Sequence, residues 1–562
     1  MSSAPTESVR LAPEQARAVW EARRSAGLTE KALAERLGLS LWEIERLEQG
    51  ETDPSPYAEA LEKHTGRPRA SFRADGFAEP SPVALTAEPP FRDRPKVISH
   101  DERAGELLVL ASIAALVLVR FFTEVVAVVP RAANFIDIPI CAMLVSVALM
   151  RPPARGAGDW LSRWVPVLAL GFLLLTVVGA VTNPSRVDIA PALVFVYGIL
   201  SPLLVYGAVR RLWPAGRALA ASRLLVALGI VQLVVVVAID IPRFVSSNNP
   251  DLISGTFGTN AYQLVFFLLL FVSLLAGIYT YERQRAVARF IPLLIALSLA
   301  TIVLAQFRAL LLTTGLCLLL GAVILGGRRS RGLIAGGMAM LAFMSALAFG
   351  AAHLPILKLN QTLHQDPVSL ASQRLNIAGQ VEQLYTDQPQ STVTGTGPGT
   401  FSSRGWQTFA LSDSTSDSNV VGSYALALTG GQPYHTDVSD RYVRPLLEHT
   451  ASVAGSRAVN QPLTDYVAVA AEVGFGGLLI LVAIYVGAFL TALRRTLSAV
   501  ASPQPLGALT ALLVTTTIAF FALLQMGVLE NWLEVTRLTF VAWALLAICT
   551  REFDARAEAA GA

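Results

Sequence analysis

Residues 263–285 read QLVFFLLLFVSLLAGIYTYERQR, an apolar run followed by a basic turn. A helix of about 20 such residues crosses a hydrocarbon core of about 30 Å. Similar runs recur along the 562-residue chain, in which 53% of the residues are hydrophobic and only 15% are charged. Soluble domains carry about a quarter charged residues. The sequence therefore predicts an all-α polytopic membrane protein.

The apolar runs that are long enough to span a membrane number twelve. The seventh and eighth runs are separated by little more than Arg308, which predicts a tight turn between them. The twelve predicted spans are 106–128, 134–150, 164–182, 188–206, 220–239, 259–280, 288–306, 309–326, 332–353, 465–493, 506–527 and 532–549.

Arginines predict the orientation of these spans. If the N-terminus lies inside, each short cytoplasmic turn is richer in arginine than the outer loops, which hold single arginines such as Arg186 and Arg243. Cytoplasmic loops are known to carry this excess. We therefore expect an even number of spans with both termini in the cytoplasm. The cytoplasmic turns contain Arg151, Arg155, Arg163, Arg210, Arg211, Arg217, Arg283, Arg285, Arg289, Arg328, Arg329, Arg331, Arg494 and Arg495.

A long outer loop interrupts the bundle. Loops of this length are usually functional or disordered, and this one combines helical stretches with a middle rich in Gly, Ser and Thr. We expect it to form a partly ordered cap over the outer mouth of the bundle. The expected organisation is a helical domain at 1–70, a Pro-rich linker at 71–104, spans one to nine at 105–353, the loop at 354–464, spans ten to twelve at 465–550 and a tail at 551–562.

The N-terminal domain has a recognisable pattern of helix starts and stops. In GLTEKALAERLGLSLWEIERLEQGETDPS, residues 27–55, Thr29 and Ser40 can start helices and Gly38 and Gly50 can end them. This stretch resembles the Cro/repressor-type helix-turn-helix family, and the resemblance covers most of residues 1–70.

The charge of this domain argues against DNA as its partner. Residues 1–70 contain ten Lys and Arg against twelve Asp and Glu, and the presumed recognition helix, 40–49, carries Glu43, Glu45 and Glu48 against Arg46. Phosphate contacts require positive charge. We therefore expect a cytoplasmic protein partner for this domain.

Three arginines are candidates for binding an anion such as pyrophosphate. Arg308 lies between two closely spaced spans, where a guanidinium is costly unless it faces a polar cavity or extends to the interface. Arg374 precedes TGTGPGTF, residues 394–401, whose backbone N–H groups could form an anion-binding concavity or simply a turn. Arg243, in an outer loop, is the third candidate. Gly397 and Gly399 are the substrate-binding candidates within TGTGPGTF.

Polar side chains also enter two of the predicted spans. Asp465 opens the tenth span and Glu472 lies about two turns deeper, where buried carboxylates are functional candidates. For Glu472 the structural alternative is a hydrogen bond to a neighbouring helix. Asn260 and Gln263 begin the sixth span, either to bind substrate or to cap the helix.

The histidines lack the spacing of metal ligands, so we expect neither a metal site nor a cofactor. His435 and His449 are candidates for proton transfer because imidazole titrates near neutrality, although either could be a surface residue. Arg120 and Glu124 are spaced for an ion pair on one helix.

The order of these features resembles the bacterial O-antigen ligase and polymerase superfamily, which includes Wzy-type polymerases and O-oligosaccharyltransferases. The matching pieces are GTFGTNAYQ at 255–263, Arg308, Arg374 with the following GTGPGTF, and DYVAVAAEVGFGG at 465–477. The resemblance covers residues 105–550.

This resemblance implies a fold similar to GT-C membrane glycosyltransferases in the bacterial cytoplasmic membrane. It also implies an undecaprenyl-pyrophosphate-linked glycan as donor and a glycan, lipid or protein as acceptor, without a metal. The family's pyrophosphate-binding arginines correspond to Arg308 and Arg374. One departure concerns the proton acceptor, because the position where many members carry a histidine is Leu463 here. His435, His449, Glu448 and Asp465 remain alternatives for that role.

Two other functions compete with transfer. A membrane-tethered sensor would use the outer loop to bind a ligand and the N-terminal domain to regulate transcription. A secondary transporter would normally show internal repeats with broken helices in matching positions, and the sequence shows no convincing repeat.

Overall fold

The computed structural model falls into two compact units, Met1–Arg94 and Pro95–Ala562, and each is treated separately below. The structure describes residues 13–39, 43–44, 47–48, 54–72, 99–151, 160–183, 187–247, 252–258, 260–281, 290–305, 308–326, 367–410, 434–447, 464–502 and 507–561. The regular secondary structure in these ranges is entirely helical, and they contain no β-strand.

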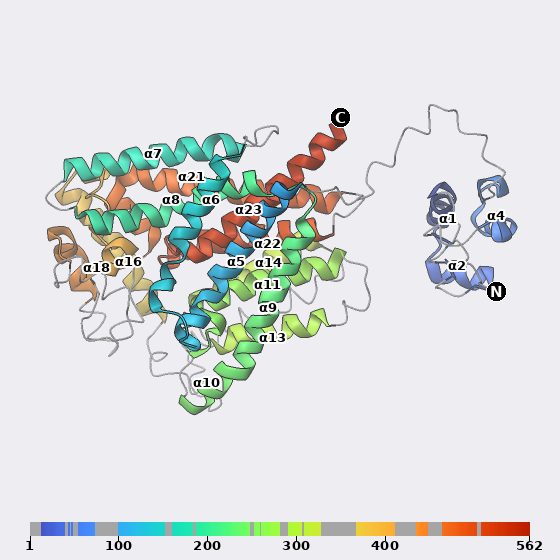
Figure 1. Cartoon of the computed structure of the whole chain (residues 1–562), viewed down its shortest axis with the longest axis horizontal. Helices are drawn as coiled ribbons and strands as arrows, with labels where there is room; N and C mark the ends of the chain where they lie inside the picture. The colour runs from blue at the N-terminus through green and yellow to red at the C-terminus, as the bar shows by residue number, and fades with distance from the viewer. Residues whose placement is uncertain are drawn as a thin grey trace. The chain divides into compact units, whose positions relative to one another are not determined.

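The first unit is a small helical domain with its own apolar core (Figure 1). Thr29 starts α2 as predicted, because its hydroxyl accepts a hydrogen bond from the N–H of Ala32, and Gly38 ends the helix in a left-handed conformation. Ser40 and Gly50 lie outside the described residues. The elements are α1 (Pro13–Ser25), α2 (Glu30–Leu37), η1 (Ser55–Tyr57), α4 (Ala58–Thr65) and η2 (Arg69–Phe72).

Glu48 points into this domain instead of lying on a charged surface. Its carboxylate binds Arg23 through Nη2 at 2.9 Å, and the two side chains are only 9% and 10% exposed. The hydrogen bonds to Glu48 raise the pKa of Arg23 above its ordinary value. One of the acidic groups that argued against DNA binding is therefore buried in an ion pair.

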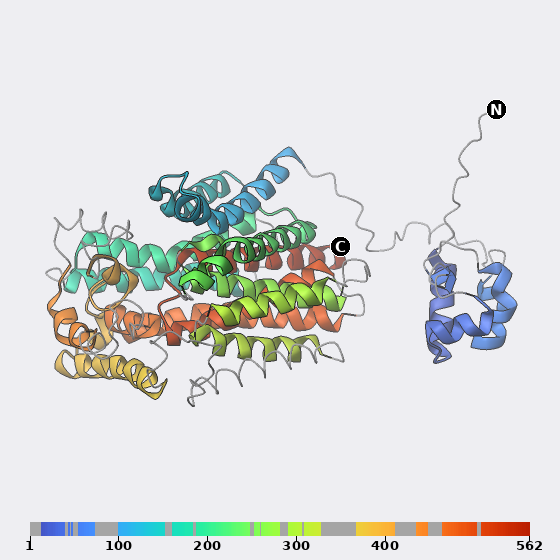
Figure 2. The same cartoon turned by 90° about the horizontal axis from the view of Figure 1, so that it is seen from below.

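The second unit is a helical bundle (Figures 1 and 2). Helix α22 packs against α11, α21, α14, α23 and α9, so it lies near the middle. The first part contains α5 (His100–Arg120), η5 (Phe121–Val125), η6 (Arg131–Phe135), α6 (Asp137–Leu149), α7 (Trp160–Thr182), α8 (Ile189–Leu212), α9 (Ala218–Val235), η7 (Val236–Asp240), α10 (Ile241–Ser247) and η9 (Gly255–Phe257). The remainder contains α11 (Ala261–Tyr281), α13 (Ile291–Leu304), α14 (Arg308–Leu325), α16 (Pro367–Asp387), α17 (Ser391–Thr394), α18 (Arg404–Ala410), η12 (Ser439–Val443), α21 (Asp465–Ala501), α22 (Ala508–Leu529) and α23 (Thr536–Gly561).

The bundle is that of a polytopic membrane protein. Eight segments in the described ranges are long and apolar enough to cross a membrane, and two shorter apolar helices accompany them at 291–304 and 310–325. The predicted ninth span, 332–353, lies outside the described residues. The eight segments are 100–125, 132–149, 160–182, 189–212, 218–247, 261–281, 465–501 and 508–529.

Several predicted boundaries shift in the structure, for example at the end of the tenth span, where α21 continues to Ala501 instead of ending at 493. Helix α5 begins at His100, within the range expected to be linker, because Ser99 and Glu102 form a capping box there. Helix α23 begins at Thr536, four residues after the predicted start of the twelfth span. Its apolar stretch from Leu538 to Cys549 is buried in the bundle.

The outer surface of the bundle is apolar where it faces away from the core. On α7, Val167, Leu170, Leu174 and Val181 are between 54% and 71% exposed. They recur at helical spacing, so they form a continuous apolar stripe. Such a stripe suits contact with lipid acyl chains.

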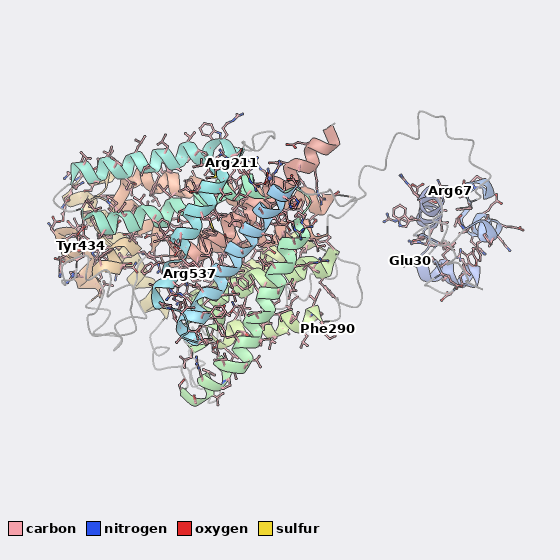
Figure 3. All side chains as sticks on the ribbon, in the orientation of Figure 1. Glu30, Arg67, Arg211, Phe290, Tyr434 and Arg537 are labelled. Carbon is pink, nitrogen blue, oxygen red and sulfur yellow. The ribbon has the colours of Figure 1, made fainter. Side chains whose placement is uncertain are left out.

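One end of the bundle carries the helices α16 and α18 (Figure 1). Figure 3 labels Tyr434 at the end where Figure 1 shows α16 and α18, and labels Arg211 and Phe290 toward the opposite end. We use the name "cap" for residues 367–410 and 434–447. The cap packs on α8 and α21 through α16, α17 and α18.

Candidate functional site

The cap is joined to the bundle at a break in α21. Gly474 adopts φ 81° and ψ 176° there, and a Cβ atom at this position would lie 2.6 Å from the carbonyl oxygen of Val393. A break of this kind leaves the carbonyl groups of the preceding turn without helical partners.

The cap supplies partners to those carbonyl groups. The N–H groups of Thr396 and Gly397 donate to the carbonyl oxygens of Ala471 at 2.8 Å and Glu472 at 3.0 Å. The hydroxyl of Tyr385 donates to the carbonyl oxygen of Ala470 at 2.7 Å. Burial raises the pKa of Tyr385 to about 12, so this hydroxyl remains a donor at neutral pH.

The Glu472 carboxylate fills the concavity formed by the glycine-rich segment. Its Oε2 accepts a hydrogen bond from the N–H of Gly399 at 2.6 Å. Its Oε1 accepts from the N–H groups of Phe401, Ser402 and Ser403 at 2.9 to 3.0 Å. The side chain is fully buried. These donors, expected to bind a substrate anion, bind a carboxylate of the protein itself in this structure.

The glycines explain how the cap approaches so closely. Gly397 and Gly399 have φ of 103° and 73°, a conformation that L side chains rarely adopt. A Cβ atom at Gly399 would lie 2.8 Å from Pro191 on α8. Both residues thus have a packing role, and contact with substrate stays a prediction for them and for Glu472.

Arg404 connects the cap to a second group of polar residues. Its N–H donates to Glu534 Oε2 at 2.8 Å, and its guanidinium donates to the Tyr262 hydroxyl at 3.2 Å and to the carbonyl oxygen of Asn531 at 3.4 Å. Cap, α11 and the turn before α23 therefore meet at one guanidinium.

Asp465 reaches the same turn from the start of α21. Its Oδ2 accepts hydrogen bonds from the N–H groups of Trp532 at 2.6 Å and Leu533 at 2.7 Å. Thr464 caps the helix just before it by accepting from the N–H of Val467. The Asp465 side chain is fully buried.

Two further arginines lie beside Tyr262. Arg120 and Arg537 both interact electrostatically with its phenol group, as Arg404 does. Arg120 pairs with Glu124 at 3.6 Å, as predicted from their spacing, and Arg537 donates to the carbonyl oxygen of Asn134. Figure 3 labels Arg537 within the bundle. A small apolar cavity lined by residues that include Phe257, Phe266 and Leu538 adjoins it.

Several polar atoms in this region are buried yet have no hydrogen-bond partner within the described residues. Native proteins pair most such atoms, so each exception calls for an explanation, and catalytic or ligand-binding roles are among them. The unpartnered atoms are Arg120 Nε, Gln263 Oε1, Asp465 Oδ1, Asn531 Oδ1, Glu534 Oε1 and Arg537 Nη1. We use the name "polar cluster" for Arg120, Tyr262, Gln263, Arg404, Asp465, Asn531, Glu534 and Arg537.

Only part of the predicted site falls within the described side chains. Arg308 begins α14 and Arg374 lies in α16, but the structure describes neither side chain. Glu448, His449 and Leu463 lie outside the described residues. The roles expected of these residues stay predictions.

Of the other predicted site residues, some lie in the polar cluster and others lie at the surface or in local hydrogen bonds. Asp465 and Gln263 belong to the polar cluster. Asn260 donates its side-chain amide to the carbonyl oxygen of Phe257 at 3.2 Å, a local bond just before α11. Arg243 is exposed on α10, and His435 is exposed beside Asp440 at 3.3 Å. No group of three or more potential metal ligands occurs among the residues that the structure describes.

The sequence reasoning missed Arg404, Asn531, Glu534 and Arg537. Glu534 and Arg537 were inside the predicted twelfth span, where ionisable residues are rare and usually functional. That signal could have found them. Arg404 had no comparable signal, because it follows the glycine-rich segment in a loop.

Comparison with known proteins bears on the N-terminal unit. Residues 21–58 match the helix-turn-helix family model. The first unit therefore carries a helix-turn-helix domain of the Cro/repressor kind, as predicted. No curated protein matches the chain.

Proposed function

We propose that this protein transfers a glycan from an undecaprenyl-pyrophosphate donor to an acceptor at the outer face of the bacterial cytoplasmic membrane. The observation that carries the proposal is the inventory of unpartnered atoms in the polar cluster. Two guanidinium nitrogens call for acceptors and four oxygens call for donors, counted within the described residues. A glycosyl diphosphate offers phosphate oxygens to the first, and the hydroxyl groups of the donor sugar and of the acceptor suit the second.

The arginines have a clear role in such a reaction. Guanidinium groups bind phosphate oxygens through strong, charge-assisted hydrogen bonds. Paired with Arg120, Arg404 or Arg537, a diphosphate becomes a better leaving group as the glycosidic bond breaks and an oxocarbenium-like state forms. Arg308 and Arg374 are proposed to contribute to the same charge on the strength of the family resemblance.

The cap gives the proposed site its cover. Arg404 follows directly after the residues that bind Glu472, so the anchoring of the cap and the position of its guanidinium are coupled. A cap that excludes water strengthens the electrostatic interactions beneath it. With a GT-C-like arrangement and both termini in the cytoplasm, the site would open toward the outer leaflet, where lipid-linked glycans are used.

Transfer by the full-length protein in liposomes tests the proposal. The liposomes would contain a labelled undecaprenyl-diphosphate oligosaccharide and a glycan or lipid acceptor. We expect wild-type protein to move the label to the acceptor without added divalent metal, and Arg404→Gln to slow transfer about 100-fold or more. Arg211→Gln, an exposed arginine toward the other end, is the matched control. Full transfer in Arg404→Gln would contradict this use of the polar cluster.

The arginines assigned by resemblance need their own variants. Arg308→Ala and Arg374→Ala are each expected to abolish transfer while leaving the protein folded in detergent. Full transfer activity in either variant would remove that residue from the mechanism.

A membrane-tethered regulator is the second candidate, favoured by the match of residues 21–58 to the helix-turn-helix family. The buried pair of Glu48 and Arg23 removes one acidic group from the face that would meet DNA. Binding of the full-length protein to random duplex DNA at low salt would support this function. We expect no shift of such a duplex, since ten basic residues in 1–70 are outnumbered by twelve acidic ones.

A further inference from the structure

Asp465 and Glu534 form a pair of carboxyl groups in the polar cluster. The Asp465 carboxylate accepts hydrogen bonds from the N–H groups of Trp532 and Leu533, the two residues that precede Glu534. The two carboxyl groups therefore belong to one turn of chain, although they come from different segments. Both side chains are buried, with 0% and 4% of the residue exposed.

Each of these carboxyl groups has one bonded oxygen and one unpartnered oxygen within the described ranges. Asp465 uses Oδ2 and leaves Oδ1, whereas Glu534 uses Oε2 for the N–H of Arg404 and leaves Oε1. Glu472 is different, because backbone N–H groups occupy both of its oxygens. The pair thus has two oxygens available to a ligand or a proton.

The charges around the pair favour one proton between the two groups. Two buried carboxylates at close range resist ionising together and titrate as a unit. Arg404 interacts with both and supplies one positive charge. Glu472 adds negative charge near Glu534, and the phenol groups of Tyr466 and Tyr485 also interact with the pair electrostatically. Counted by themselves, Asp465, Glu534 and Arg404 have zero net charge when one carboxyl group is ionised and the other is protonated.

We propose that Asp465 and Glu534 share one proton and that this pair accepts the proton of the acceptor hydroxyl during glycan transfer. The second half of this inference rests on the proposed function. In that step the acceptor oxygen bonds to the anomeric carbon as the bond from that carbon to the diphosphate breaks. The diphosphate leaves with the electron pair, and the hydroxyl proton moves to the ionised carboxylate. The doubly protonated pair then returns one proton to solvent.

This assignment addresses the missing histidine. The corresponding position is Leu463, which has no titratable group. Of the described candidates, His435 is 50% exposed and pairs with Asp440 in the cap. The pair instead lies beside Arg404, the residue proposed to bind the diphosphate.

The shared proton can be tested without any substrate. Infrared spectra of the full-length protein in lipid nanodiscs would report the C=O stretch of a buried carboxylic acid. We expect this band in the wild type and its loss in both Glu534→Gln and Asp465→Asn, because the remaining single carboxylate is balanced by Arg404. Glu552→Gln, a buried carboxylate with both oxygens hydrogen-bonded, is the control and should keep the band. A band that persists in both single variants would overturn the shared proton.

Transfer assays test the catalytic half. Glu534→Gln should lower the transfer rate about 100-fold or more while leaving the donor dissociation constant within about twofold, since a base contributes roughly 100-fold or more to rate. Glu534→Asp should restore part of the rate, and Glu552→Gln should match the wild type per folded molecule. Unchanged transfer in Glu534→Gln would overturn the role as base. If wild-type protein transfers no glycan at all, the proposed function fails, while the infrared band still decides whether the pair exists.

Discussion

The two ends of the bundle differ in how completely their carboxylates are hydrogen-bonded. At the end near Arg211, Glu106 binds Arg217 at 2.9 Å through both oxygens, and Asp554 binds Arg210 and Arg495 through one oxygen each. Glu552 accepts hydrogen bonds from Trp213 and from backbone N–H groups. In the polar cluster, by contrast, Asp465 and Glu534 each keep an oxygen that has no partner among the described residues.

We interpret this difference as a division between carboxylates that stabilise the structure and carboxylates that are available to a substrate. A buried carboxylate with all its partners fixes the helices that supply them, and removing it leaves those donors unsatisfied. A buried carboxylate with a spare oxygen is under-bonded, and a catalytic or ligand-binding role is one explanation for such an atom. Among these carboxylates, burial therefore does not distinguish the polar cluster from the other end, whereas the degree of pairing does.

Glu472 shows that position alone does not decide the degree of hydrogen bonding, because it lies under the cap yet both of its oxygens are bonded. Glu472→Ala leaves four backbone donors of the cap without an acceptor. At about 1–3 kcal/mol for each unsatisfied group, we expect a loss of about 4 kcal/mol or more in cap stability. Hydrogen exchange of residues 395–403 in the full-length protein measures this, and unchanged protection there would contradict it.

Glu552→Ala tests a carboxylate at the other end, where both oxygens are hydrogen-bonded. Its donors include the indole of Trp213 and the N–H groups of Gly216 and Arg217, which belong to the turn between α8 and α9. We expect a loss of about 3–5 kcal/mol in unfolding free energy, because three donors lose their acceptor at about 1–3 kcal/mol each. Thermal unfolding in detergent measures it, with exposed Arg494→Gln as control. A loss no larger than that of the control would show that pairing there does not stabilise the bundle.

Gly258→Ala tests whether the packing around Glu124 holds Arg120 of the polar cluster in place. Gly258 has φ +68°, and a Cβ atom there would overlap the Glu124 carboxylate that pairs with Arg120. We expect a cost of about 1–3 kcal/mol from backbone strain, with displacement of Arg120. Gly207→Ala, where a Cβ atom meets nothing within 4 Å, is the matched control. Equal unfolding temperatures for the two variants would contradict the expectation.

Glu534→Gln should have the smallest effect on stability and so sharpens the comparison most. The amide oxygen can still accept from the N–H of Arg404, and one buried charge is removed. We expect a change within about 1 kcal/mol in unfolding free energy. Thermal unfolding beside Glu552→Ala checks the contrast. A loss as large as that of Glu552→Ala would mean that Glu534 is a structural residue after all.

Local sequence rules accounted for much of the fold. The length of apolar runs predicted spans such as 259–280 and 506–527, which the structure has as 261–281 and 508–529. Thr29 and Gly38 correctly marked the ends of α2. The spacing of Arg120 and Glu124 predicted their ion pair. Each of these features depends on residues close together in the chain, so sequence alone carries the information.

The candidate site was only partly predictable. Asp465 and Gln263 were singled out because polar groups stand out in apolar runs. The partners of Glu472, in contrast, are about seventy residues away in the cap, and no local pattern indicates them. Glu48 was taken for a surface charge because nothing near it in sequence reveals Arg23, 25 residues earlier.

The sequence by itself determined that this chain is an all-helical membrane protein with a helix-turn-helix domain, because hydrophobic length and helix capping act over a few turns of chain. Only the tertiary structure decided which buried charges are satisfied. Hydrogen bonding is a matter of a few ångströms in space, and Arg404, Asp465 and Glu534 are brought to one place by a cap, a broken helix and a turn that lie far apart in the sequence.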